Sequence, residues 1–72
     1  GIDRITTALG QMRMKGVASA EEMRQLTEAG INSWEYLAKA LNTDVAGAMK
    51  MVERRMVDGK AAAEVIIRGM GQ

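Results

Sequence analysis

The chain is 72 residues long and contains neither cysteine nor histidine, which excludes disulfide bonds and the usual zinc, iron and copper ligand sets. The common nucleophile–base pairs of enzymes lose their usual base, so we expect no catalysis, no metal and no cofactor. Ten basic and nine acidic residues leave a formal net charge of +1, without the basic bias of a dedicated nucleic-acid module. A chain of this length forms one domain at most, and because it begins with Gly1 and not with methionine we expect it to be a fragment of a much longer protein.

The first predicted helix covers residues 2–14. Its apolar side chains recur every three or four positions and form one stripe, which consists of Ile2, Ile5, Leu9 and Met12. Gly10 lies inside this helix and costs it about 1 kcal/mol relative to alanine.

A capping box marks the start of the second helix, because Ser19 is followed three positions later by Glu22. In this motif the serine oxygen accepts a hydrogen bond from the backbone amide three residues on, and the glutamate reaches back to the serine amide. The side chains on one side of the helix are Met23, Leu26 and Thr27. The helix ends at Gly30, which can adopt the left-handed conformation, and Ile31 is placed to pack back across the turn.

The third helix begins at Asn32 or Ser33, since either side chain can cap it. Its apolar face consists of Trp34, Leu37, Ala38 and Leu41. Trp34 is one of only two aromatic residues in the chain, and we expect it to anchor the core.

The fourth helix, which we expect to be the longest, is capped by Thr43. Asp44 lies in its first turn, where a negative charge suits the helix dipole, and Gly59 ends it. The residues that we expect to face the core are four, three and four positions apart, namely Val45, Met49, Val52 and Met56.

The last helix covers residues 62–70. Ala61 and Ala62 stand at its start. An alanine at a helix cap costs about 1 kcal/mol, so we expect this helix to start late or fray. Its inward residues are Val65, Ile66 and Met70. Connections of only two to five residues make neighbouring helices pack side by side or at steep angles. The sequence therefore predicts an all-α fold, a compact orthogonal bundle of four to five short helices.

Seven methionines and no phenylalanine make an unusual apolar composition. The methionines on predicted inner faces, where they fill irregular gaps, are Met12, Met23, Met49, Met56 and Met70. Met14 and Met51 lie off these stripes. They are candidates for an exposed contact with a partner or with the rest of a longer chain.

Basic residues gather towards the end of the fourth helix and beyond it, namely Lys50, Arg54, Arg55, Lys60 and Arg68. Acidic residues are interleaved with them, which favours a solvated face with salt bridges over a nucleic-acid-binding patch. Of this cluster, we count Lys50, Arg54 and Arg55 with the candidate partner contact.

The turn at Gly30 is also similar to a helix-hairpin-helix, in which backbone amides around a glycine turn hold a DNA phosphate. Glu28 and Glu35 lie close to this turn, and their negative charge would repel a phosphate. A plain helix stop between two packed helices is the favoured interpretation, and a small nucleic-acid-binding module stays an alternative.

The stretch KGVASAEEMRQLTEAGI, residues 15–31, resembles the domain found in phage tail tape measure proteins. The resemblance continues through Trp34, the LAKAL run at residues 37–41 and the VDGK run at residues 57–60. It covers nearly everything from about Met12 to Met70. Asn42 stands where glycine is expected after the LAKAL helix.

The resemblance implies a non-catalytic structural and assembly module of a bacteriophage or prophage tail tape measure protein. Such a protein is long and mostly helical, sets the tail length and occupies the virion tail, after assembly in the bacterial host cytoplasm. The implied partners are other tail proteins or other parts of the same long chain, with no small-molecule substrate and no membrane for this segment. A generic bacterial protein-interaction domain is a further alternative.

Overall fold

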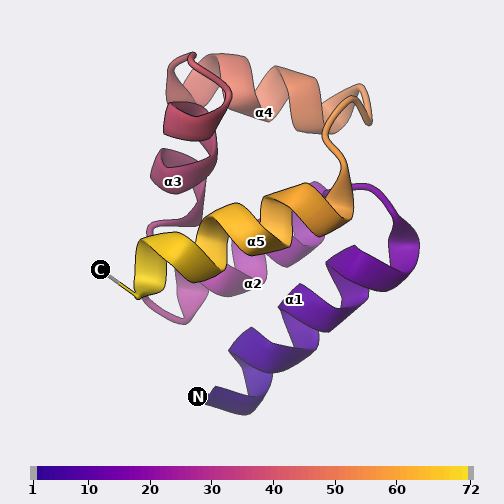
Figure 1. The fold of residues 1–72 in the computed structure, drawn as a ribbon, viewed down its shortest axis with the longest axis vertical. Coiled ribbons are helices and arrows are strands. Elements are labelled where there is room, and N and C mark those ends of the chain that lie inside the picture. The colour runs from indigo at the N-terminus through magenta and orange to yellow at the C-terminus, as the bar shows by residue number, and fades with distance from the viewer. Residues whose placement is uncertain (1, 72) are drawn as a thin grey trace.

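The computed structural model describes residues 2–71, with side chains from Arg4 onward, and folds them into five α-helices (Figure 1). These are α1 (Ile2–Lys15), α2 (Ala20–Glu28), α3 (Ser33–Ala40), α4 (Val45–Glu53) and α5 (Gly59–Met70). The described part of the chain contains no strand and measures 28 × 25 × 18 Å. The predicted all-α, compact bundle of short helices is confirmed.

One hydrophobic core joins the helices. α1 packs against both α2 and α5, while α3 packs against α5 and α4. The largest fully buried apolar side chains are Met12, Met23, Leu26, Leu37 and Ile66. The sequence predicted all of them as core residues, and the burial of each contributes about 1.5–3 kcal/mol. The side chain of Ile2, the first member of the predicted stripe on α1, lies outside the described part of the chain.

Gly30 stops helix α2, as predicted, two residues after the last helical residue, Glu28. This glycine has a φ of 92°, and its N–H donates to the carbonyl of Thr27 at 3.0 Å. The next amide, of Ile31, donates to the carbonyl of Leu26 at 2.9 Å. The two bonds form a Schellman motif, which satisfies carbonyls that the helix leaves free and turns Ile31 back towards the core.

Two further helices end in the same motif without a glycine. After α3 the left-handed residue is Asn42 (φ 58°), and the Thr43 amide donates to the carbonyl of Ala38 at 3.0 Å. After α4 it is Arg55 (φ 57°), followed by a bond from Met56 to Met51 at 3.0 Å. Because Arg55 turns the chain, α4 ends at Glu53 and the prediction that it runs to Gly59 is wrong. The longest helix is α1, with 14 residues.

Aspartate side chains cap both α4 and α5. The Asp44 carboxylate accepts from the amide of Gly47 at 2.7 Å, and the Asp58 carboxylate accepts from the amide of Ala61 at 2.9 Å. The prediction that Thr43 caps α4 is wrong by one residue, because Thr43 belongs to the motif that ends α3. α5 likewise begins three residues before its predicted start and is capped.

Gly59 joins the start of α5 to the end of α1. Its N–H donates to the carbonyl of Gly16 at 3.0 Å, and the Ala18 amide donates to the carbonyl of Val57 at 2.9 Å. A Cβ at residue 59 would overlap the carbonyl of Met12 and lie 2.9 Å from the amide nitrogen of Val17. Only glycine therefore allows this close approach of two backbones.

The face that α4 turns to the core differs from the predicted one. Met49 is 41% exposed and Met56 is 63% exposed, so their assignment to the core is wrong. Val52 is buried, as predicted. Ala48 is also buried, and Met51 packs against the core. Apolar residues lie on several sides of α4, so helical spacing alone does not determine which side is buried. Met56 lies beyond the end of α4, so helical spacing no longer determines where its side chain lies.

Among the remaining predicted core residues, some are only half-buried. Trp34 and Leu41 on or beside α3 pack against the core, as expected. Val45 and Val65 are also half-buried, at the margins of the inner faces of α4 and α5.

Candidate functional site

The predicted contact residues come from two parts of the fold, the end of α1 and the second half of α4 with the turn after it. Met14 is 88% exposed near the end of α1. Lys50, Arg54 and Arg55 are exposed on and after the last turn of α4. Met51 is half-buried and packs against the core, so its assignment to an exposed contact is wrong. The positions that expose methionine near α4 are instead Met49 and Met56.

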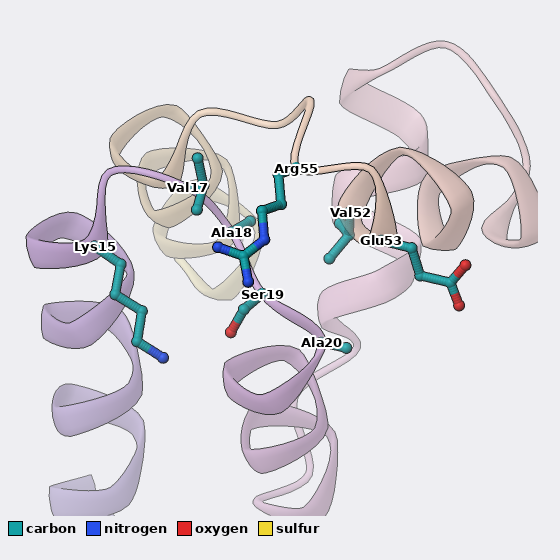
Figure 2. A pocket seen from close by; sticks show the side chains of 8 residues that line it. All are labelled: Lys15, Val17, Ala18, Ser19, Ala20, Val52, Glu53 and Arg55. Carbon is teal, nitrogen blue, oxygen red and sulfur yellow. The ribbon is translucent and has the colours of Figure 1, made fainter.

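A hollow of about 450 Å³ lies where the end of α1, the α1–α2 connection and the end of α4 meet (Figure 2). Lys15, Ser19, Glu53 and Arg55 supply its polar side chains, and its walls include Val17 and Val52. Figure 2 shows the Arg55 guanidinium directed over Ser19, whereas the Glu53 carboxylate points away from it. The hollow therefore presents a guanidinium and a hydroxyl between apolar walls.

The backbone fixes the place of Arg55 in this hollow. Its left-handed conformation costs a residue with a Cβ about 1–2 kcal/mol, and the bond from its amide to the Val52 carbonyl, 3.0 Å long, holds the turn. Among the side chains that the structure describes, Arg55 has no ion-pair partner. Sequence reasoning grouped Arg55 with its basic neighbours but missed the hollow, since arginine carries no signal for a left-handed turn.

Glu22 is a buried carboxylate at the edge of this region, only 1% exposed. The Lys15 ammonium donates to one of its oxygens at 2.9 Å, and the Ser19 hydroxyl donates to the other. Ser19 does occupy the cap position of α2, but its side chain does not bond a helix amide. The predicted bonds of the capping box are therefore wrong. The reason is tertiary: Lys15 comes from another helix, and charged hydrogen bonds are stronger than neutral ones.

The turn at Gly30 was the candidate phosphate site of the nucleic-acid alternative. The amides of Gly30, Ile31 and Ser33 all donate to protein carbonyls, so they cannot also bind a phosphate. The nearby Glu28 carboxylate lies 3.8 Å from Arg4 and 3.9 Å from Arg24. These three amides are therefore not available as donors to an anion.

Behind the same turn, two hydroxyls join α2 to α3. Ser33 is fully buried, and its hydroxyl donates to the carbonyl of Met23 at 3.2 Å. The Thr27 hydroxyl donates to the same carbonyl at 3.0 Å and lies 3.2 Å from the Ser33 oxygen. The sequence placed Ser33 as a possible cap. In the structure it is a buried link, which no local pattern distinguishes from a cap.

The described side chains offer ion pairing and apolar contact. Within residues 4–71, no three acidic side chains come together in a group that could hold a metal ion. No helix of the described chain is both long and apolar enough to cross a membrane. The Arg55 guanidinium and the exposed methionines are among the described groups that are free to contact a second molecule.

No family model matches the chain, and neither a curated protein nor a solved structure does.

Proposed function

We propose that this chain is a non-catalytic assembly module of a bacteriophage or prophage tail tape measure protein. The observation that carries the proposal is the resemblance of residues 15–31 to the tape measure domain. Its most specific residues each have a physical role in the fold. Met23 and Leu26 are buried, Glu22 binds Lys15, and Gly30 ends α2 in the left-handed conformation. The motif therefore consists largely of residues that stabilise this fold.

The dimensions of the domain bear on its role in such a protein. Its longest extent is 28 Å, whereas 72 residues in one continuous helix would span about 108 Å. A domain folded in this way adds little length for its number of residues. We therefore assign it to contacts with other tail proteins, or with other parts of its own long chain, in the virion tail and in the host cytoplasm during assembly. Exposed Met14, Lys50, Arg54 and Arg55 are the candidate contact residues.

An in-frame deletion of the module from the phage that encodes it tests the proposal. We expect fewer complete tails, with a length unchanged within a few tens of ångströms, when particles are measured by electron microscopy. The matched control is Ile66→Ala, which weakens the fold without removing residues and should reduce the yield of tails in the same direction. Tails formed at full yield without the module contradict the proposal. Tails shortened by about 108 Å would show that these residues measure length as an extended helix.

The two alternatives predict other outcomes. A nucleic-acid module would bind short duplex DNA with an affinity that falls steeply with salt, measured by fluorescence anisotropy. The occupied amides at Gly30 lead us to expect no such binding. A generic protein-interaction domain would be encoded away from tail genes, and its deletion would leave tails intact.

A further inference from the structure

A second surface feature, which shares Ala20 and Glu53 with the hollow of Figure 2, is an apolar groove between α2, α3 and α4. Its volume is about 460 Å³, and its lining residues are Ala20, Arg24, Thr27, Trp34, Met49 and Glu53. Trp34 is half-buried against the core, and Met49 is exposed at the edge. Tryptophan, methionine and arginine are the residues that protein interfaces favour over the rest of the surface. We name this feature the Trp34 groove.

The two charged residues of the Trp34 groove have opposite signs and come from different helices. Arg24 lies on α2, and its only ion pair with a described residue is with Glu28, at 3.9 Å between two exposed side chains. An exposed pair of this kind contributes little and can be exchanged for another partner. Glu53 ends α4, is exposed, and has no ion pair among the described side chains. A partner that complements both charges presents a negative group to α2 and a positive group to α4.

We propose that the occupant of the Trp34 groove is a second copy of this chain, related to the first by a two-fold axis. In such an interface the contact from Arg24 to the other copy's Glu53 occurs twice, because each copy supplies both charges. The apolar residues Trp34 and Met49 of the two copies then meet near the axis. The formal net charge of +1 sets little repulsion against this association. The groove is small, so we expect a weak dimer, and the fraction of chains in it rises with protein concentration. This dimer does not depend on the tape measure proposal.

Sedimentation velocity of the chain at concentrations up to about 1 mM tests the dimer. The weight-average sedimentation coefficient should rise with concentration towards that of a dimer, and the emission of Trp34 should shift to shorter wavelength as it is covered. A sedimentation coefficient that stays at the monomer value over the whole range overturns the proposal and leaves the groove to a different partner.

Charge reversal locates the interface. Arg24→Glu and Glu53→Arg should each remove the dimer, because each places two like-charged contacts across the axis. An equimolar mixture of these two variants should dimerise again, since one copy then has two acidic and the other two basic side chains in the groove. The double variant should also dimerise. The matched controls are Lys60→Glu and Glu64→Arg, which change the net charge equally on exposed positions of α5 and should leave the dimer intact.

Circular dichroism of each variant keeps the test interpretable. Equal helix content in the two single variants means that a lost dimer reflects the interface. If either single variant unfolds, the mixture cannot be used, and the comparison of the double variant with the wild type still decides. A wild-type dimer that neither reversal weakens would place the interface elsewhere and overturn the assignment to the Trp34 groove.

Discussion

The contact between α1 and α5 and the attachment of α4 show two different ways of holding a helix in a small protein. Between α1 and α5, backbones meet directly at Gly59, and Met12 and Ile66 are fully buried. α4 packs mainly on α3, touches α2 lightly, and buries only Ala48 and Val52. In the turn after it, Arg55 adopts a left-handed conformation that does not suit arginine.

The two regions differ in how much they contribute to the stability of the fold and in how exposed their side chains are. Side chains on α1, α2 and α5 fill the core, so changes there should act on the whole fold. α4 has fewer buried side chains and carries the exposed methionine and basic residues, so it should open locally at lower free energy. Four pairs of substitutions can break or sharpen this distinction.

The largest contrast is expected between Ile66→Ala and Met49→Ala. Ile66 is fully buried, so its truncation should lower the free energy of unfolding by about 2–5 kcal/mol. Met49 is 41% exposed, and its truncation should change the free energy by less than about 0.5 kcal/mol. Urea denaturation followed by circular dichroism measures both. Comparable losses would contradict the peripheral place of α4.

Gly59→Ala should be nearly as damaging, with a loss of about 3 kcal/mol, because the added methyl group meets the backbone carbonyl of Met12. The matched control is Gly10→Ala in α1, where a Cβ would have no neighbour within 4 Å. That substitution should stabilise the protein by about 0.5–1 kcal/mol through helix propensity. Thermal unfolding of the two variants should therefore move in opposite directions.

The two aspartate caps allow a comparison at equal chemistry. Asp58→Ala and Asp44→Ala each remove one bond to a helix amide and should each cost about 1 kcal/mol where the helix is part of the cooperative unit. We expect Asp58→Ala to lower global stability. Asp44→Ala should mainly speed amide hydrogen exchange within α4. If amide exchange becomes faster by the same factor in all helices of both variants, α4 unfolds together with the rest of the domain.

The smallest effect is expected from the left-handed residues. Arg55→Gly should stabilise the protein by up to about 1 kcal/mol, because glycine adopts a positive φ without strain. Asn42→Gly should gain less, since asparagine tolerates this conformation better than arginine. Differential scanning calorimetry resolves the order. A loss of stability in Arg55→Gly would mean that the contacts of the arginine side chain stabilise the fold by more than its left-handed backbone conformation costs.

The first half of the fold could be predicted because its signals are local. Gly30 is both glycine and left-handed, and the apolar stripes of α1, α2 and α3 each have one clear side. The α4–α5 boundary failed for a physical reason. Arg55 adopts the conformation expected of Gly59, so the stop was placed at the wrong residue. Asp58 ahead of an alanine run is a cap signal that could have corrected it.

The candidate site was less accessible to sequence reasoning. The spacing of Ser19 and Glu22 predicted bonds to backbone amides. Lys15 instead reaches Glu22 from another helix, and the Ser19 hydroxyl bonds to the Glu22 carboxylate. Similarly, α4 is apolar on several sides, so only its packing on α3 determines that Met51 is covered and Met49 is open. Tertiary neighbours of this kind leave no mark in the spacing of residues.

The backbone bonds at Gly16 and Gly59 also have a mechanical consequence. The segment from α2 to α4 lies between these two residues in the chain, so the bonds close it off at its base. When the chain is pulled from its two ends, tension passes through α1 and α5 and across this junction. Helices α2 to α4 feel no tension until the junction separates, which makes it the point where the domain yields to force.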